Sequence, residues 1–472
     1  MKQKIWEFTS FRENVAFIDE FGCEMTYGQL VAEGVDLART IRKRTLVFCI
    51  CANSIGSVFG YVTFMQHGIV PLLVSAHMDE GLFDNLLRLY KPEYIWIPIS
   101  EADKYGNTYL YEAYGYKLLK TIFENPYPLN DKLALLLTTS GSTGSPKFVR
   151  QSYVNVKANI ESIVEYLELD ASERPITTLP MNYTYGLSII HTHLYVGATI
   201  LLTDKGLMQK EFWQLFKERG ATSFAGVPYT YEMLDKLRFY RMNLPSLHTM
   251  TQAGGKITLE LHEKFAQYAK ETGRKFVVMY GQCEATARMG YLPADKAVEK
   301  RGAMGIAIPG GKFKLVNDDG NKICEPFTTG ELIYEGKNVT LGYAENGEDL
   351  IKDDERHGVL ETGDVAQYDE EGYYYIVGRK RRFLKIYGNR VNLDEIDRLI
   401  KGRLDIEAAS TGVDDHMYVF LTDEKYKKEV KNLLASKTKL NPAAFHIKVI
   451  KAIPKNDAGK VLYRELDSYC KI

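Results

Sequence analysis

Continuous apolar runs alternate with segments of helical periodicity through about the first 290 residues of the chain. Residues 133–137 and 276–279 are uninterrupted apolar runs, as expected for strands that are buried on both faces. Between positions 151 and 170 the apolar residues recur at the helical period, at Val156, Ile160, Ile163, Val164 and Leu167. This alternation predicts an α/β fold, in which parallel-rich sheets are flanked by helices.

Two long stretches, 46–76 and 176–203, contain no Asp, Glu, Lys or Arg. Their length alone would suit a membrane span. Polar residues and glycines interrupt the first, however, and predict a strand at 46–51, a helix capped near Asn53 or Ser54 that stops at Gly68, and a strand at 69–74. The second stretch has the same pattern. We therefore expect two strand–helix–strand units and no membrane span.

The sequence pattern changes from about residue 302, where short strand-like segments alternate with glycine turns. After the basic run at 379–382, about 90 residues of mixed helical and strand character follow, enough for a small α+β domain. We expect a large N-terminal domain over 1–380, with the β-rich segment inside it, and a small mobile domain over 381–472.

Composition excludes some classes of partner and suggests a compartment. The chain has 45% hydrophobic and 26% charged residues and a formal net charge of −1, so electrostatics does not favour nucleic acid or an anionic membrane as the main partner. The six cysteines are irregularly spaced, without a C-x-x-C pair, which favours reduced thiols in the cytoplasm. The N-terminus has no apolar core of a signal peptide.

The segment TTSGSTGSPK at 138–147 has the most suggestive chemistry. It follows the predicted strand at 133–137 and combines two glycines, several hydroxyl side chains and Lys147. Glycines let the backbone approach a ligand, and hydroxyls with free N–H groups can surround phosphate oxygens. The spacing is not the Walker pattern, because no Gly-Lys-Ser/Thr closes the loop. Taken alone, the segment could equally be a Gly/Ser-rich turn.

Five further segments hold glycines or charged residues suited to a nucleotide site: Gly254-Gly255 in QAGGKIT, Glu284 in YGQCEAT, Asp364 in ETGDVA, Arg379 in VGRKRR and Lys460 in PKNDAGK. Taken singly, each has a structural explanation, such as a turn residue, a solvated charge or a carboxylate at a helix start. The turn after the strand at 276–279 and the loop after the strand at 133–137 both lie where ligands gather in parallel sheets. We expect these two motifs to face one crevice.

In this order the motifs resemble those of the adenylate-forming superfamily, which includes acyl-CoA synthetases, peptide-synthetase adenylation domains and luciferases. TSGSTGSPK resembles the phosphate loop of the family, and YGQCEA its Tyr-Gly-x-Thr-Glu motif. GELIYEGKNVTLGY at 330–343, TGD at 362–364, GRKRRFLKIYGNRVNLDEID and PKNDAGK are similar to four later motifs. The resemblance covers nearly the whole chain.

The resemblance implies that a carboxylate attacks the α-phosphate of ATP, giving an acyl-adenylate and pyrophosphate, and that a thiol or amine then displaces AMP. It assigns phosphate contacts to the loop residues Thr139, Ser140, Gly141, Ser142, Thr143, Gly144 and Lys147. It assigns adenine, ribose and α-phosphate contacts to Gly254, Gly255, Tyr280, Gly281, Cys283, Asp364 and Arg379. Glu284 would ligate Mg²⁺, and Lys460 would stabilise charge during adenylation.

The resemblance also implies that the small domain swings between the two half-reactions. The hinge position is Arg381, and Lys385 resembles a residue that serves the second half-reaction in some members. Cys283 stands where the family usually has Thr, and a thiol is a weaker hydrogen-bond donor than a hydroxyl. No departure removes a charged catalytic group, so we expect an active enzyme.

The acyl pocket is assigned by resemblance to the segment at 179–202, through Tyr183, Thr184 and Gly186. Amino-acid-activating members have Asp where this chain has Thr184, which argues against an α-amino acid. Tyr185, His191 and His193 could be substrate contacts or core residues. The expected acceptor is CoA; the alternatives are the phosphopantetheine arm of a separate carrier protein, and a nucleotide-binding relative without turnover.

Overall fold

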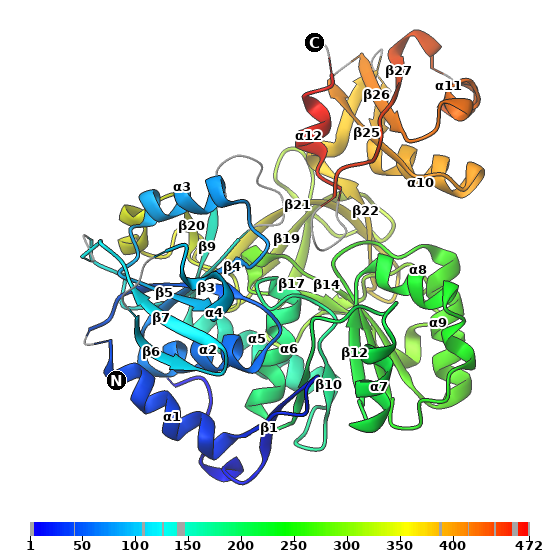
Figure 1. Ribbon diagram of the computed structural model, residues 1–472. Helices are drawn as coiled ribbons and strands as arrows, with labels where there is room; N and C mark the ends of the chain where they lie inside the picture. Colours follow the sequence, from blue (N-terminus) through cyan, green and yellow to red (C-terminus); the bar gives the residue numbers. More distant parts are fainter. Residues whose placement is uncertain are drawn as a thin grey trace. The chain divides into compact units, whose positions relative to one another are not determined.

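The computed structural model describes residues 4–41, 43–105, 109–124, 127–138, 147–386, 389–413, 415–438, 440–455 and 461–470. The chain forms two compact units (Figure 1). The first contains residues 1–313 and 334–360, and the second contains 314–333 and 361–472. Part of the β-rich segment therefore belongs to the same compact unit as the C-terminal residues. The predicted functional boundary at 380/381 stays a prediction.

The N-terminal strands of the first unit form an eight-stranded sheet of order β20–β9–β8–β4–β3–β5–β7–β6. β8, β4, β3 and β5 are parallel, and antiparallel strands complete both edges. The strands are β3 (Leu46–Cys51), β4 (Val70–Ser75), β5 (Tyr94–Pro98), β6 (Tyr109–Ala113), β7 (Tyr116–Lys120), β8 (Leu133–Thr138), β9 (Phe148–Ser152) and β20 (Gly342–Ala344).

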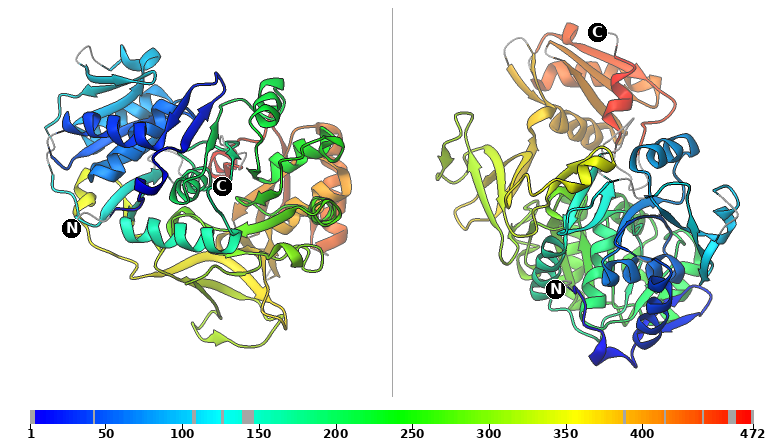
Figure 2. Two further views of the ribbon diagram at one scale, coloured as in Figure 1. Left: turned by 90° about the horizontal axis from the view of Figure 1, so that it is seen from below. Right: turned by 90° about the vertical axis from the view of Figure 1, so that its left-hand side faces the viewer.

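A nine-stranded sheet of order β16–β15–β14–β13–β12–β10–β11–β1–β2 forms the other half of this unit, and Figures 1 and 2 show the two sheets as separate bodies of strands. Its central strands from β14 to β1 are parallel. The strands are β1 (Val15–Asp19), β2 (Glu24–Thr26), β10 (Pro175–Ile176), β11 (Ile200–Leu202), β12 (Ser223–Gly226), β13 (Thr249–Gln252), β14 (Lys275–Tyr280), β15 (Gly290–Tyr291) and β16 (Ile306–Ala307).

The two-residue alternation of β3 explains why its charge-free sequence is buried. Val47, Cys49 and Cys51 belong to one core cluster, while Phe48 and Ile50 belong to another on the opposite face. The first cluster also contains residues of α2, α5, α6 and the nine-stranded sheet. The helices of the first unit are α1 (Tyr27–Arg39), α2 (Ile55–His67), α3 (Glu80–Tyr90), α4 (Ile99–Ala102), α5 (Tyr153–Leu167), α6 (Thr184–Tyr195), α7 (Lys210–Glu218), α8 (Pro228–Lys236) and α9 (Leu259–Thr272).

The second unit contains most of a five-stranded sheet and a small α+β body. The five-stranded sheet has the order β18 (Lys322–Ile323), β17 (Lys312–Val316), β19 (Gly330–Glu335), β21 (Val359–Tyr368) and β22 (Tyr374–Arg379). The C-terminal body has a hairpin of β23 (Phe383–Ile386) and β24 (Asn389–Asn392). It also has a sheet of β25 (Ala408–Val413), β26 (His416–Leu421) and β27 (Phe445–Val449). Its helices are α10 (Leu393–Leu404), α11 (Lys427–Thr438) and α12 (Tyr463–Asp467).

Alternate residues of β26 serve opposite faces of the C-terminal sheet. Met417, Val419 and Leu421 pack with residues of α10 and α11, whereas Tyr418 and Phe420 pack on the face that carries α12. Figure 1 shows α12 and α11 at opposite sides of this sheet. The predicted α+β character of the C-terminal residues is therefore confirmed.

The predicted α/β fold class is also confirmed, and both charge-free stretches form strand–helix–strand units. In the first, α2 is capped by Ser54 and ends at Gly68 with φ +75°, but its second strand begins one residue later than expected. Among the described residues, no helix is long and apolar enough to cross a membrane.

The two motifs that were expected to face one crevice follow strands of different sheets. β8 precedes the Gly/Ser-rich loop and lies in the eight-stranded sheet, whereas β14 precedes the Tyr280 turn and lies in the nine-stranded sheet. In addition, residues 148–152 form an antiparallel strand, β9, so the loop joins two strands of a hairpin. Each motif still follows the carboxyl end of a strand.

Candidate active site

Glu284 lies in a 3₁₀ turn, η3 (Cys283–Ala285), shortly after β14. Its carboxylate Oε1 accepts a hydrogen bond from the Tyr343 hydroxyl at 2.7 Å. Its carbonyl oxygen accepts hydrogen bonds at 3.0 Å from the Thr340 N–H, the Thr340 hydroxyl and Arg356 Nη1. Backbone and side chain are thus both held by residues 340–356, and the half-buried carboxylate has a defined position.

The backbone directly after Glu284 is strained. Thr286 has φ +66° and ψ −57°, and the Ala287 N–H donates to Ala285 O at 2.7 Å, which is the rare and strained form of the γ-turn. The Thr286 hydroxyl donates to Asn338 O at 2.7 Å, and its own carbonyl accepts from the Thr184 hydroxyl. These bonds hold a conformation that a β-branched residue otherwise avoids.

The same turn explains Gly281. A Cβ at Gly281 would stand 1.7 Å from Ala287 O, so the chain before Glu284 and the chain after it approach closer than any side chain permits. Cys283 is buried in the turn. Tyr280 is half-buried and lies with its ring 6.3 Å from that of Phe313. The structure therefore brings together Tyr280, Gly281, Cys283 and Glu284 in one rigid turn.

Gly254 lies against Tyr183, a residue of the segment 179–202 to which the acyl pocket is assigned. It has φ +83°, and a Cβ there would stand 2.6 Å from the Tyr183 hydroxyl and 3.0 Å from Val227. Gly255 lies against the Pro228 ring in the same way. Tyr183 immediately precedes α6 and is therefore in contact with the glycine backbone assigned to adenine.

The other two predicted pocket residues are used in packing. Thr184 is buried and its hydroxyl is bonded to Thr286 O. At Gly186 a Cβ would stand 2.4 Å from Pro180 O, so glycine is needed for α6 to pass the preceding turn. Both residues thereby fix the start of α6 and the position of Tyr183.

Arg150 connects β9, the strand after the Gly/Ser-rich loop, to the segment that holds the Glu284 turn. Its fully buried side chain, on β9, donates to the carbonyls of Tyr343, Leu341, Lys352 and Asp353 and to the Glu355 carboxylate at 2.6 Å. A Cβ at Gly342 would clash with Glu355 Oε2 at 2.2 Å. Sequence reasoning missed Arg150, Tyr343 and Arg356. The available signal for the first was an arginine directly after the apolar pair Phe148-Val149.

Lys147 lies at the start of β9. Its Nζ pairs with Glu345 Oε1 at 2.5 Å and lies 5.9 Å from the centre of the Tyr343 ring. Both charged side chains are more than half exposed, so this pair is screened by water and can be exchanged for a ligand anion at little cost. The loop residues Thr139, Ser140, Gly141, Ser142, Thr143 and Gly144 lie outside the described residues, as does Lys460.

In the second unit, Asp364 and Arg379 are register partners on the antiparallel strands β21 and β22. Asp364 Oδ1 pairs with Arg379 Nε at 3.2 Å. The aspartate side chain is 5% exposed and the arginine side chain 62%. Arg381 lies in η6 (Lys380–Arg382) and Lys385 in β23, and the structure describes their backbone alone.

His191 and His193 are core residues of α6. His191 Nε2 is 2.6 Å from the Tyr61 hydroxyl, and its ring also packs against Trp6. His193 Nδ1 is 2.8 Å from Ile189 O. Burial lowers the pKa of His191 to about 3 and that of His193 to about 4. Both side chains are therefore neutral at pH 7 and act as packing.

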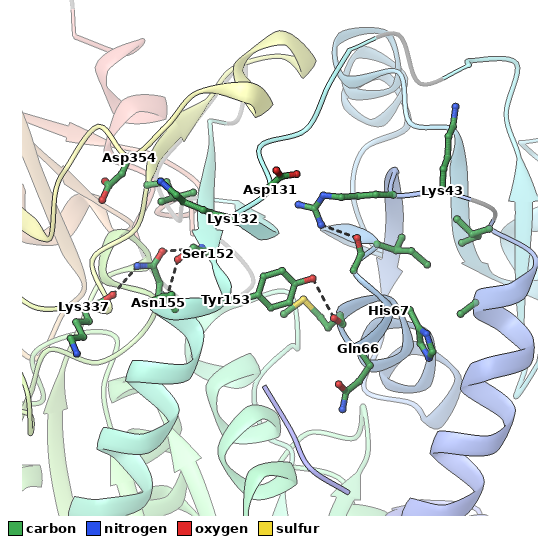
Figure 3. A pocket seen from close by; sticks show the side chains of 18 of the residues that line it. Lys43, Gln66, His67, Asp131, Lys132, Ser152, Tyr153, Asn155, Lys337 and Asp354 are labelled. Atoms are coloured by element: carbon green, nitrogen blue, oxygen red, sulfur yellow. Dashed lines mark hydrogen bonds between the residues drawn. The ribbon is translucent and has the colours of Figure 1, made fainter. Parts of the chain in front are cut away.

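A further groove of the described surface lies elsewhere. It has a volume of about 1110 Å³ and is lined by residues around α1, α2 and the start of α5 (Figure 3). It adjoins the residues before β8 and after β9, at the opposite end of that hairpin from the phosphate loop. Three of its basic residues are already engaged: Lys132 pairs with Asp353, Lys43 with Glu93, and Arg44 donates to three carbonyls. No predicted site residue lines it.

Comparison with known proteins places this arrangement in a family. The model of the family described as AMP-binding enzyme matches residues 6–344, a span that contains the phosphate loop, the Glu284 turn and Tyr343. The chain belongs to this family.

Relatives of this AMP-binding enzyme include a 2-succinylbenzoate–CoA ligase of Bacillus pumilus, 28% identical over 388 residues, which are 79% of this chain and 76% of the relative. The 4-coumarate–CoA ligase-like 2 of Arabidopsis thaliana is 27% identical, over 71% of this chain and 61% of its own length. Among solved structures, the o-succinylbenzoate CoA synthetase of Bacillus subtilis with ATP and magnesium has a TM-score of 0.77 at 21% identity, covering 96% of both chains.

The two histidines predict a pH-dependent stability. Both bind a proton near pH 6.5 in the unfolded chain and only near pH 3 to 4 in the folded protein, so acid favours the unfolded state. We expect the stability that they contribute to be complete above pH 6.5 and to fall by about 2–3 kcal/mol between pH 7.5 and 5.5. Urea unfolding at both pH values measures this change. His191→Gln with His193→Gln should reduce it, whereas the exposed His77→Gln should not.

Proposed function

We propose that the protein activates a carboxylic acid with ATP, releasing pyrophosphate, and then transfers the acyl group from the adenylate to the thiol of CoA. The observation that carries this proposal is the match to the AMP-binding enzymes across residues 6–344, together with relatives that are CoA ligases of different acids. The enzyme is then an AMP-forming acid–thiol ligase.

The first step brings a carboxylate and a triphosphate together, so positive charge must face the developing negative charge. In the proposal, the loop from Thr139 to Gly144 and Lys147 contact the β- and γ-phosphates. Tyr280 stacks on adenine beside Gly254 and Gly255, with Gly281 and Cys283 in the same turn. Asp364 accepts hydrogen bonds from the ribose hydroxyls next to Arg379. The exchangeable pair of Lys147 with Glu345 supports this role.

Glu284 suits a magnesium site. Mg²⁺ prefers oxygen ligands and is usually held by one or two carboxylates together with substrate phosphates. Among the described residues no group of three His, Cys, Asp or Glu could hold a metal by itself, so in the proposal Glu284 shares the ion with the phosphates of ATP. When bound, Mg²⁺ neutralises phosphate charge. The hydrogen bond from Tyr343 orients the Glu284 carboxylate for this task.

The second part of the proposal concerns domain movement. Residues 1–380 bind ATP and the acid, and 381–472 carry Lys460, which stabilises the transferring charge during adenylation. Arg381 is the hinge, and Lys385 serves the second half-reaction. Tyr183, Thr184 and Gly186 belong to the acyl pocket. A separate carrier protein is the alternative acceptor; a cytoplasmic location and the absence of a nucleic-acid partner complete the proposal.

Exchange of pyrophosphate into ATP, measured across a panel of acids, tests the adenylation step. We expect at least one acid to support exchange, and Lys460→Ala to reduce it by about 10²-fold or more while ATP binding persists. Lys451→Ala removes a nearby exposed lysine and should have no effect. No exchange with any acid would contradict the enzymatic proposal. Adding CoA or a carrier protein to the adenylate then identifies the acceptor.

Tyr343→Phe tests the orientation of Glu284 without a measurement of turnover. Loss of the hydroxyl should raise the Mg²⁺ concentration for half-maximal ATP binding by about tenfold, because partners of a metal ligand set its affinity. Calorimetric titration of ATP at varied Mg²⁺ measures this. Tyr114→Phe removes a comparable hydroxyl–carboxylate bond, to Glu33 at 2.8 Å, and should leave the midpoint unchanged. An unchanged midpoint in Tyr343→Phe would show that the hydrogen bond does not hold the ligand.

Cys283→Thr restores the hydroxyl that the family usually has. Because a hydroxyl donates a stronger hydrogen bond than a thiol, we expect the exchange rate to be equal or higher. A fall of more than about tenfold, roughly 1.4 kcal/mol, would instead assign a role of its own to the buried thiol.

A further inference from the structure

Arg288 is a buried charge that the proposed mechanism does not use. It lies four residues after Glu284 and is 3% exposed. Its main chain is fixed from three sides: the N–H donates to Asn159 Oδ1, and the carbonyl accepts from the side-chain amides of Asn159 and Asn338. The guanidinium is therefore carried at a defined place.

Buried arginines elsewhere in the chain have carboxylate partners. Among the described residues three arginines are buried, Arg150, Arg288 and Arg382. Arg150 pairs with Glu355, and Arg382 pairs with Asp394 and Asp397, both at 2.7 Å. No described carboxylate pairs with Arg288. An interior cation without a counter-ion is costly, which is why buried charges are normally paired.

The contacts that Arg288 does make are with neutral groups. Its Cζ lies 4.0 Å from the centre of the Tyr185 ring, and Nε donates to Met279 Sδ at 3.2 Å. The Tyr166 hydroxyl also lies beside the guanidinium. Burial raises the pKa of Tyr166, and the charge of Arg288 opposes this rise. A thioether is a weak hydrogen-bond acceptor, and an aromatic face lacks the paired oxygens that accept two parallel N–H bonds from a guanidinium. The planar set of donors is suited to a carboxylate from outside the chain.

The position of Arg288 relates it to the acyl segment. Tyr183 contacts the backbone of Gly254, and its ring lies 6.3 Å from that of Tyr185, whose face carries Arg288. Residues 254, 183, 185 and 288 thus form a continuous row of contacts that starts at the predicted adenine site. Arg288 stands at the end of this row that is remote from the nucleotide.

We propose that Arg288 binds a second carboxylate of the acid substrate, so that the enzyme activates dicarboxylic acids. One carboxylate reacts at the α-phosphate, and the other supplies the missing counter-ion of the guanidinium. The partly buried and mutually stacked pair of Tyr166 and Tyr291 adjoins Arg288 through Tyr166. This inference rests on the proposed adenylation.

Isosteric pairs of acids test the proposal in the unaltered enzyme. Succinate, glutarate and adipate are compared with butyrate, pentanoate and hexanoate in pyrophosphate exchange, because each pair differs only in the terminal carboxylate or methyl group. We expect kcat/KM for the best diacid to exceed that of its isostere by at least about 10²-fold, since a site built for a polar group rejects an analogue that lacks it. Preference for the methyl-terminated acids would overturn the inference and leave adenylation standing. Exchange with neither series, nor with any other acid, would overturn both.

Variants separate recognition from structural support. Arg288→Met should lower kcat/KM for the diacid by about 10²-fold while kcat/KM for the matching monoacid is kept or raised, and Arg288→Lys should lie between. Arg274→Met removes a guanidinium that also stacks on a tyrosine, Tyr268 at 5.3 Å, and should leave the preference unchanged. Equal losses for both acids in Arg288→Met and in Arg288→Lys would make Arg288 a structural residue.

Discussion

The buried guanidinium of Arg150 is the constraint on which the rest of the large unit depends. One side chain on β9 holds the carbonyls of residues 341, 343, 352 and 353, and it is balanced by Glu355. The segment held in this way supplies Thr340, Tyr343 and Arg356 to Glu284. The buried guanidinium of Arg150 needs an acceptor for each of its N–H groups. These hydrogen bonds therefore set the distance between β9, the strand after the Gly/Ser-rich loop, and the turn after β14.

Two buried arginines and two exposed cations have different tasks in this protein. Arg150 and Arg382 are buried, have carboxylate partners and hold backbone segments in place. Lys147 and Arg379 belong to the predicted nucleotide contacts, and both are largely exposed in their ion pairs. The pair of Lys147 with Glu345 is exposed on both sides and is worth little, so a ligand anion can replace its carboxylate without a large loss. Rigid support and exchangeable contact thus come from different residues.

The sequence predicted most of these helices and strands, but not how the strands pair. Apolar runs predicted β3, β8 and β14 because strands buried on both faces need no polar positions, and Ser54 and Gly68 marked the ends of α2 through their capping chemistry. The hairpin partner β9 was missed, because its sequence FVRQS places an arginine and a glutamine in the interior. Which strands share a sheet was not predicted either, because periodicity reports burial, whereas strand pairing depends on contacts between distant residues. Likewise, motif position selected Thr184 and Gly186 for the substrate pocket but could not show that their packing also fixes the γ-turn at Thr286 and the start of α6.

The hairpin topology of β8 and β9 has a consequence for how phosphates are held. In many nucleotide-binding folds the loop after a strand leads straight into a helix, whose macrodipole and free N–H groups attract the anion. Here the loop leads into β9, and the next helix, α5, begins only at Tyr153, where the Ser152 and Asn155 side chains already occupy N-terminal amides. Among the described residues, α5 is therefore the first helix after this loop, and the strand β9 separates the two. In the proposed function, the described group of this region that would attract the triphosphate is Lys147, whose exposed charge is screened by salt.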